Sequence, residues 1–362
     1  MDPFVAVALS MLPASRSRVA STFKELRLQS DPGSDIAADD VLEAVLEVCE
    51  IPEDERRGAM QVARSRADAA LVAARVAGIE PLPWDDPRYP ALLSCIPDPP
   101  PLLWVRGDAD TLARPTVAIV GSRAATPYAL DVAYRLGQEL SDRGVVVASG
   151  LARGVDSAAH RGCLGGAAAT VAVLGSGLDR IYPSEHQALA REISDKGLLV
   201  SELGPGAAPL QEHFPLRNRI ISGIALAVVV VEASEKSGSL ITARCALEQG
   251  RDVLAVPGSV LSGRNRGSHS LLKDGAKVVE SAVDILEGLG WPMPDAPLAL
   301  PSKLLISDNL LARMEIGEVY RLDELMELTG VTGTKLLTRL MELELAGLVT
   351  QSGSGFSRRL VT

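Results

Sequence analysis

Between residues 117 and 279 the chain repeats one pattern: a short run of β-branched and small apolar residues, then a segment long enough for a helix. The apolar runs cover residues 117–120, 145–147, 170–174, 198–201, 227–232, 253–256 and 277–279. Strands that alternate with helices in this way pair in parallel and carry helices on both faces. The pattern therefore predicts an α/β domain built on a mostly parallel sheet.

Two regions precede this domain. Residues 1–80 place apolar and charged residues at helical spacing, which predicts a small helical domain. Residues 81–115 are dense in proline, and a proline-rich stretch cannot carry a central strand or a helix interior. We therefore expect residues 81–115 to be an extended connector.

The last part of the chain has a different pattern. A Pro-rich linker at residues 291–301 leads into residues 302–362, where we predict helices near Ser307, Arg321 and Thr332, then a hairpin: a winged helix. The helix expected from residue 332 to residue 346 balances two basic residues with two glutamates. A helix that reads duplex DNA is more basic, so we expect this domain to add little to DNA binding.

Composition limits the partners. The formal net charge of −10 excludes a general basic coat, and an aromatic content of 3% leaves few platforms for stacking bases. The four cysteines are far apart in sequence, which predicts neither disulfides nor zinc. No leader or membrane-length apolar run is apparent, so we expect a cytoplasmic protein with buried, reduced thiols.

Glycine and serine follow the predicted strands. In open parallel sheets ligands bind beyond the carboxyl ends of the strands, where glycine lets a phosphate approach the amides of the next helix. One such turn is ordinary loop chemistry, but a series along one edge predicts an anion site. The residues concerned are Gly121, Ser122, Ser149, Gly150, Gly175, Ser237, Gly238 and Ser239.

Arginines accompany these turns. Arg217 and Arg219 flank Asn218 at the start of a predicted helix, which makes this segment the strongest candidate for a phosphate clamp. The remaining candidates are Arg123 and Arg153 in the first two loops, and Arg264 and Arg266 after the sixth strand.

Catalytic groups are not predicted. His160 has no second ligand at metal spacing and is expected to be a packed or capping residue. Asp156 is expected to cap the helix that follows it, and Glu202 could orient Arg217 or Arg219 as easily as act as a base. Neither a phosphate-binding Walker loop nor an uninterrupted dinucleotide motif is present. We therefore expect no catalytic residue, no metal and no cofactor.

From about Tyr89 onward the motifs, taken in order, resemble the DprA/Smf family of DNA-processing proteins. The matching segments are VAIVGSR at 117–123, SGLARGVD at 149–156, LGSGLDRIYP at 174–183, FPLRNRII at 214–221, SGSLITA at 237–243 and VPG at 256–258. Their number and common order make a chance similarity very improbable.

The resemblance implies an extended Rossmann-like DNA-binding domain over residues 116–290, with a helical domain before it that is similar to a SAM or helix-hairpin-helix module. It implies that the domain binds single-stranded DNA through Arg123 and through Phe214, Arg217 and Arg219. Where some members carry a lysine that contacts DNA, this chain has Gln211.

The family's role implies the partners. Its members protect incoming DNA and load the RecA recombinase onto it during natural transformation. The resemblance therefore implies single-stranded DNA, RecA, single-strand-binding protein and a second copy of the chain as partners, with no membrane.

Two other functions fit the residues less well. The scaffold also resembles nucleoside-phosphate phosphoribohydrolases, but their PGGxGTxxE turn carries a glutamate where this chain has Cys245. A structural adaptor would leave the arginines of the sheet edge without a ligand. We therefore expect a DNA-binding protein that is not an enzyme.

Overall fold

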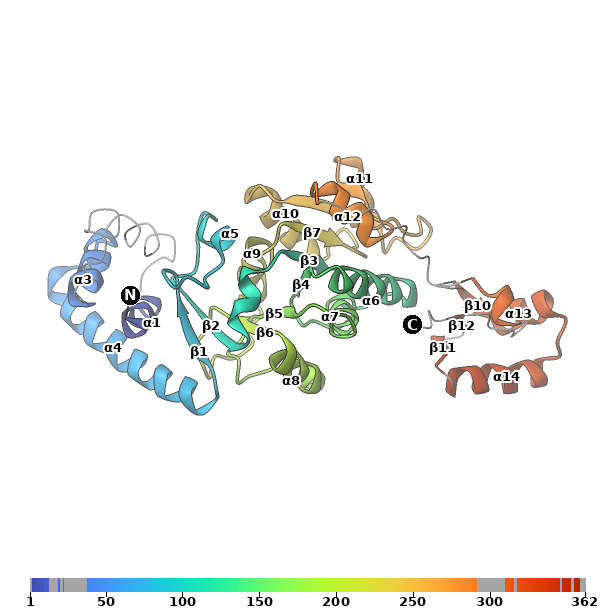
Figure 1. Cartoon of the computed structure of the whole chain (residues 1–362), viewed down its shortest axis with the longest axis horizontal. Helices are drawn as coiled ribbons and strands as arrows, with labels where there is room; N and C mark the ends of the chain where they lie inside the picture. Colours follow the sequence, from blue (N-terminus) through green and yellow to red (C-terminus); the bar gives the residue numbers. More distant parts are fainter. Residues whose placement is uncertain are drawn as a thin grey trace.

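The computed structural model describes residues 2–12, 19, 22, 38–291, 310–315, 318–345, 347–352 and 355–358 (Figure 1). Of the predicted features, most of the linker at 291–301 and the helix near Ser307 lie outside these residues. In the described part no helix is both long enough and apolar enough to cross a bilayer.

Helices α1 (Pro3–Ser10), α3 (Ala38–Val48) and α4 (Glu53–Val76) form the N-terminal unit. Helix α1 is almost wholly apolar and is buried between the other helices and the sheet. Helix α4 begins after Pro52, where the missing N–H of proline costs no helical hydrogen bond. The unit packs beside the β1 end of the sheet (Figure 1).

The central domain is a nine-stranded sheet in the order β1-β2-β6-β5-β4-β3-β7-β8-β9. Strands β3 to β9 are parallel, whereas β1 and β2 pair antiparallel. The strands are β1 (Glu80–Pro83), β2 (Leu102–Gly107), β3 (Thr116–Val120), β4 (Val146–Ser149), β5 (Thr170–Leu174), β6 (Leu198–Ser201), β7 (Ala227–Val230), β8 (Asp252–Ala255) and β9 (Lys277–Val278).

Helices cover both faces of this sheet, as the apolar runs require. One face carries α6, α7, α8 and α12; the other carries α5, α9 and α10. The bounds are α5 (Ala91–Ser94), α6 (Pro127–Asp142), α7 (Val155–Leu164), α8 (Gln187–Lys196), α9 (His213–Gly223), α10 (Ser239–Glu248), α11 (Arg266–Lys273) and α12 (Ala282–Gly288), with short 3-10 turns η1 (Ala109–Ala113) and η2 (Ser184–His186).

The interpretation of residues 81–115 as a connector is wrong. Strand β1 pairs with β2, and β2 pairs with β6, so this segment extends the sheet by two strands. The prolines still avoid the central strands. Pro81 and Pro83 lie in the edge strand β1, and strand β2 contains no proline.

The C-terminal unit has its own apolar core. Strand β10 (Val319–Arg321) is followed by helices α13 (Leu322–Thr329) and α14 (Gly333–Leu345), then by the hairpin of β11 (Val349–Ser352) and β12 (Gly355–Arg358). The 3-10 turn η3 (Leu311–Arg313) contributes Leu311 to the core. Two helices and a three-stranded sheet with a terminal hairpin confirm the winged helix. The predicted fold class is therefore confirmed, while the exact domain boundaries stay predictions.

Candidate functional site

A cavity of about 680 Å³ opens beyond the carboxyl ends of β3 to β7, where ligand sites of parallel sheets lie. Nine of the predicted site residues line it: Gly121, Ser122, Arg123, Phe214, Arg217, Asn218, Ser237, Gly238 and Ser239. Segments that are far apart in the sequence therefore meet at one pocket, as predicted from the loops that follow the strands.

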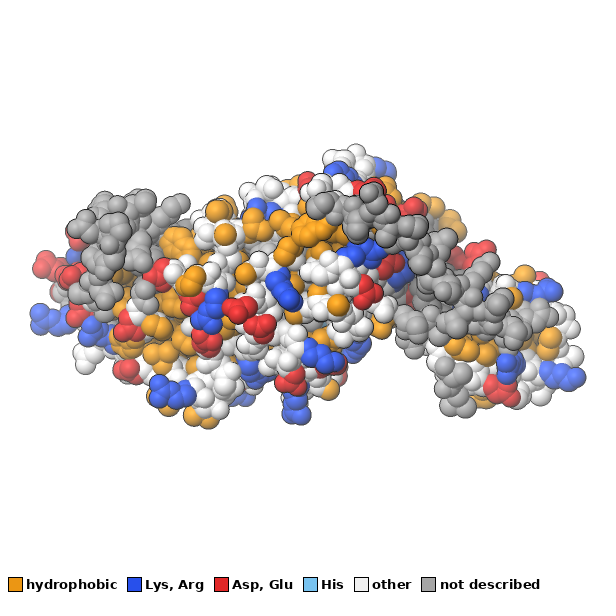
Figure 2. All heavy atoms as spheres, in the orientation of Figure 1, with side chains coloured by type: hydrophobic (Ala, Val, Ile, Leu, Met, Phe, Trp, Pro, Cys, Tyr) orange, Lys and Arg blue, Asp and Glu red, His pale blue; other side chains and the backbone are white. Residues whose placement is uncertain are grey.

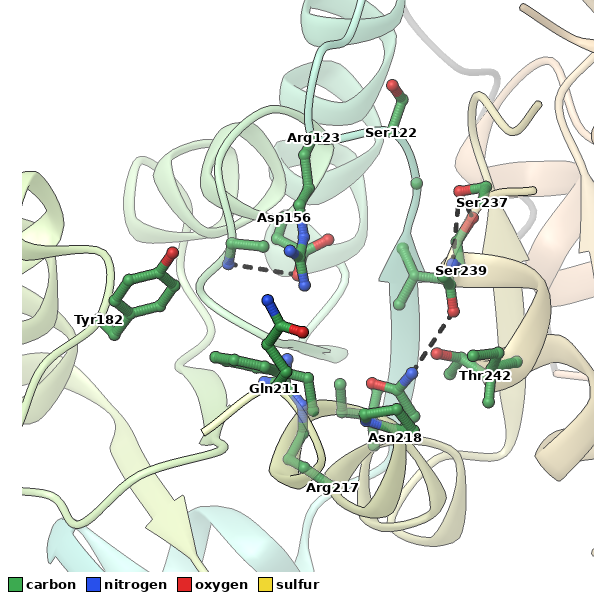
Figure 3. Close-up of a pocket in the computed structure, with 18 of the residues that line it drawn as sticks. Ser122, Arg123, Asp156, Tyr182, Gln211, Arg217, Asn218, Ser237, Ser239 and Thr242 are labelled. Atoms are coloured by element: carbon green, nitrogen blue, oxygen red, sulfur yellow. Dashed lines mark hydrogen bonds between the residues drawn. The ribbon is translucent and has the colours of Figure 1, made fainter. Parts of the chain in front are cut away.

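Aromatic rings and a cation form one side of the pocket. The guanidinium carbon of Arg123 lies 5.4 Å from the centre of the Phe214 ring. The ring of Tyr182 is tilted against Phe214 with 5.6 Å between the ring centres. Figure 3 shows Arg123 pointing into the cavity from the loop after β3. The arrangement offers a positive charge and aromatic surface side by side.

Polar groups of α9 and α10 form the opposite side (Figure 3). The amide of Asn218 donates to the carbonyl oxygen of Gly238 at 3.4 Å, and the hydroxyls of Ser237 and Ser239 are 2.7 Å apart. Thr242 lies one helical turn further along α10. Hydroxyls and amides of this kind can donate or accept hydrogen bonds with a polar ligand.

Asp156 lies buried beneath the pocket and does not cap its helix, so that prediction is wrong. The N-cap of α7 is Gly154. One carboxylate oxygen of Asp156 instead accepts hydrogen bonds from the amides of Gly150 at 3.1 Å and Ala152 at 3.3 Å. Burial raises the pKa of Asp156, while the charge of Arg217 and these two hydrogen bonds act in the opposite direction.

Arg217 and Arg219 do not form a phosphate clamp. The guanidinium of Arg217 is directed beneath the pocket, where Nη1 donates to the carbonyl oxygens of Gly150, at 2.8 Å, and Val173. Only 6% of Arg217 is exposed. Burial lowers its pKa to about 10, which still leaves it charged at neutral pH.

Arg219 is turned away from the pocket. Its Nε lies 2.9 Å from Asp98 and its Nη2 2.8 Å from Glu202, and its side chain is 7% exposed. Of the two alternatives for Glu202, the structure supports orientation of an arginine. Asp98 comes from the segment between α5 and β2, so Arg219 ties this segment to the end of β6.

The other predicted residues lie below or beside the pocket. Gly175 leaves room for the Phe214 ring, because a Cβ there would be 3.0 Å from a ring carbon. Ser149 is buried and its hydroxyl donates to Ile119. Arg153 is exposed and pairs with Glu185, Arg264 donates to the carbonyl oxygen of Ala124, and exposed Arg266 lies 3.9 Å from Glu235.

Residues outside the predicted set also line the pocket. Tyr182 and Asp156 stand inside the motifs already quoted, so their motif positions were the available signal. Gln211 projects into the middle of the cavity (Figure 3), although it comes from a loop with no regular pattern. Thr242 follows Ser239 by three residues on α10, and helical spacing could have placed it on the same face.

The histidine and cysteine interpretations have mixed outcomes. His160 is fully buried, with its Nδ1 2.7 Å from the hydroxyl of Thr170, so it is a packed residue. Cys163 is buried as expected, but Cys95 is exposed. Cys245 is half-buried on α10, outside the set of residues that line the pocket.

Few basic side chains are available to an anionic ligand at the pocket. On the face shown in Figure 2, basic and acidic side chains are interspersed without a continuous basic band outside the grey residues. Arg123 lines the pocket and is exposed, whereas Arg217 lines it from a buried position. An anionic ligand therefore meets few cations here.

Comparisons with known proteins identify the family of the chain. Residues 81–290 match the family model of DNA recombination-mediator protein A, and residues 294–355 match the DprA winged helix domain. Protein Smf of Escherichia coli is 40% identical over 294 residues, which cover 76% of each chain. DNA processing protein DprA of Streptococcus pneumoniae is 47% identical over 201 residues, 56% of this chain and 71% of the relative.

Solved structures show the same relationship. The X-ray structure of DNA processing protein A from Streptococcus pneumoniae superposes with a TM-score of 0.70 at 33% identity, covering 81% of this chain and 99% of that one. DNA processing protein A from Helicobacter pylori, described with a single-stranded DNA binding mode, has a TM-score of 0.53 at 30% identity, over 58% and 95% of the two chains. The chain therefore belongs to the DprA/Smf family of DNA recombination-mediator proteins.

Proposed function

We propose that this chain binds single-stranded DNA in the pocket beyond β3 to β7 and does not cut it. The observation that carries the proposal is Arg123 over the Phe214 ring at a cavity of about 680 Å³. The cation can contact a phosphate of a single strand, and the aromatic ring can stack on a base of the same strand. The Helicobacter pylori relative, described with a single-stranded DNA binding mode, supports the proposal.

The pocket geometry also supports the proposed preference for single strands. Its lining comes from the loops that follow several strands and from helices α7, α9 and α10, and we propose that a nucleotide leaves its base stack to enter. An unpaired base does so at little cost, whereas a paired base must first be extruded from the duplex. The proposed contacts in the pocket are Gly121, Ser122, Arg123, Phe214, Asn218, Ser237, Gly238 and Ser239, with Arg153, Arg264 and Arg266 as outer contacts.

Fluorescence anisotropy tests the proposal. Labelled single-stranded and duplex oligonucleotides are titrated with the wild type, with Arg123→Ala and with Arg66→Ala, an exposed arginine on α4 that serves as the control. We expect the wild type to bind the single strand tightly and not the duplex. Arg123→Ala should lower the affinity for the single strand, and Arg66→Ala should leave it unchanged. Equal affinity of wild type and Arg123→Ala for the single strand would refute the site.

We also propose that the bound strand is protected and passed to the RecA recombinase during natural transformation, with single-strand-binding protein as a further partner. Family membership supports this role. The assay is strand exchange by the recombinase on DNA that is already coated with single-strand-binding protein. We expect the wild-type protein to shorten the delay before strand exchange begins, and Arg123→Ala to leave the delay unchanged. If the wild-type protein does not shorten the delay, the proposed role is wrong.

A homodimer formed through the central domain is part of the proposal. Strand β9 is an edge of the sheet, and Val278 in it is 52% exposed, so this edge carries an apolar side chain that a second copy could cover. Sedimentation of wild type against Val278→Lys tests this. The DNA partner supports a cytoplasmic location, which fractionation of cells would check.

Hydrolysis of nucleotides is the rival function. It is not favoured, because Asp156, the carboxylate among the residues that line the pocket, accepts two backbone hydrogen bonds, and Glu202 pairs with Arg219. In the described part of the chain no group of His, Cys, Asp or Glu side chains could hold a metal. If the protein hydrolyses nucleoside monophosphates and Asp156→Asn abolishes this activity, the rival function is supported.

A further inference from the structure

The loop between β4 and α7, residues 150–154, is fixed from beneath by two buried charges. Asp156 accepts from the amides of Gly150 and Ala152, at 3.1 and 3.3 Å. Arg217 donates to the carbonyl oxygen of the same Gly150 at 2.8 Å, and also to Val173 in β5. The main chain of Gly150 is therefore held on its N–H side by a carboxylate and on its C=O side by a guanidinium.

The loop needs such support because of its backbone. Leu151 has a φ of 57°, a left-handed conformation that residues with a large side chain rarely adopt. Its carbonyl oxygen accepts a hydrogen bond from Nδ1 of His186 at 2.9 Å. With Asp156 and Arg217, this bond fixes three consecutive residues of the loop.

The loop in turn supports the residue that faces the ligand. Gly154 has a φ of 79° and packs against the backbone of Ser122 and Arg123, so closely that a Cβ would collide with the Ser122 carbonyl oxygen. The amide of Val155 donates to that same oxygen at 3.2 Å. A shift of the loop would therefore move the turn from which Arg123 enters the pocket.

The buried charges of Asp156 and Arg217 also affect how the pocket meets an anionic ligand. Asp156 lines the floor of the pocket, where an uncompensated carboxylate would repel a phosphate. Arg217 is a buried cation bonded to the same Gly150, and its charge acts on Asp156 and on Arg123. The two buried charges have opposite sign and both contact Gly150, so they oppose each other and leave Arg123 as the exposed cation that the ligand meets.

We propose that Arg217 is a positioning residue: it holds the 150–154 loop in place and neutralises Asp156, and it does not itself contact DNA. The inference rests on the proposed binding of single-stranded DNA at this pocket, and it assigns the first arginine of the FPLRNR segment a role beneath the strand. Arg123 and Phe214 remain the groups that the strand touches.

A double mutant separates this role from direct contact. Arg217→Gln removes the charge and leaves Asp156 uncompensated, so we expect single-strand affinity to fall at least tenfold. Asp156→Asn keeps an acceptor for the two amides. The combined Asp156→Asn/Arg217→Gln protein is neutral beneath the pocket again but still lacks the bonds to Gly150 and Val173, so we expect it to regain the part of the affinity that the uncompensated carboxylate had removed. If Arg217 contacted a phosphate, the double mutant would bind as weakly as Arg217→Gln.

Salt dependence gives an independent readout on the same proteins. Loss of one phosphate contact makes the slope of log affinity against log salt shallower by about 0.7 for a single strand. We expect the double mutant to keep the wild-type slope, because it has lost no phosphate contact. A slope shallower by about 0.7 in the double mutant would overturn the proposal.

A steric variant avoids any change of charge. A Cβ on Gly150 would lie 2.5 Å from both Nη atoms of Arg217, so Gly150→Ala pushes the guanidinium off its carbonyl acceptors. Gly150 has no positive φ that would forbid alanine. We expect Gly150→Ala to weaken single-strand binding, with Gly58→Ala, which has open space around its Cβ, as the neutral control. Unchanged affinity in folded Gly150→Ala would contradict the proposal, and its thermal unfolding shows whether it folds.

Arg123→Ala, measured in parallel, distinguishes the two levels of inference. If Arg123→Ala binds as wild type does, the proposed site itself is wrong. If Arg123→Ala is weak and the double mutant is not restored, the site stands and only the role of Arg217 is refuted.

Discussion

Salt dependence of single-strand binding follows directly from which arginines are accessible. Arg217 and Arg219 are buried and bonded within the protein, so neither is free to exchange counterions with DNA. Four candidates remain exposed: Arg123 in the pocket, and Arg153, Arg264 and Arg266 beside it. Arg153 is hydrogen-bonded to Glu185, so three of the four are counted as free to neutralise a phosphate. At about 0.7 per neutralised phosphate, three contacts give a slope near −2 for log affinity against log salt.

The change Arg123→Ala should reduce that slope to about −1.4. A fourfold rise in salt then weakens wild type about 20-fold and the variant about sevenfold. The variant also loses the cation beside the Phe214 ring, so its affinity at low salt is expected to fall by tenfold or more, about 1.4 kcal/mol.

The assay is an anisotropy titration at several salt concentrations, with Arg66→Ala as the control. Parallel lines for wild type and Arg123→Ala would show that Arg123 shapes its loop without contacting a phosphate. A wild-type slope steeper than about −3 would require more cations than the structure exposes here, and would refute the burial argument for Arg217 and Arg219.

Further expected outcomes test the pocket and the fold. Gln211→Lys places a cation in the middle of the cavity and should steepen the salt slope by about 0.7; an unchanged slope would mean that the strand does not pass residue 211. Gly162→Ala should lower the free energy of unfolding by about 1–3 kcal/mol in urea titrations, because its Cβ would collide with the Tyr134 carbonyl oxygen where α6 and α7 touch. Burial lowers the pKa of His160 to about 3 from 6.5, so the folded state binds fewer protons than the unfolded state and stability falls as the pH drops below 6.5, by about 1.4 kcal/mol per pH unit. His160→Gln should lose less stability than wild type between pH 6.5 and 5; equal losses would contradict the assignment. Removal of residues 292–362 should leave single-strand affinity unchanged, and a tenfold loss would show that the winged helix binds DNA.

The sequence predicts the parallel part of the sheet well because its strands are buried on both faces. The run at residues 170–174 coincides with β5, and residues 253–256 differ from β8 by one position. Such strands must be apolar along their whole length, so their pattern is local and visible. The pocket follows from the same regularity, since parallel strands bring their carboxyl ends, and the loops after them, to one edge.

Strands β1 and β2 could not be predicted in that way. Strand β2 pairs with β6, whose residues lie about ninety positions later in the chain, and nothing local announces such a partner. The prolines correctly excluded a central position for β1, but they say nothing of an edge. The prolines showed where a strand could not lie but gave no sign of where it does lie. One side of an edge strand makes no backbone hydrogen bonds, so proline is tolerated there.

The direction of an arginine is harder to predict than its presence, yet helical geometry does decide one case. Arg217 and Arg219 lie two positions apart on α9, and at 100° per residue they point about 200° away from each other. Two side chains on opposite sides of a helix cannot hold one phosphate. Phe214, three positions before Arg217, lies on its side of the helix and lines the same pocket, whereas Arg219 meets Asp98 and Glu202 on the other side. A motif that contains two arginines can therefore carry two separate structural roles, and burial decides which charges the ligand meets.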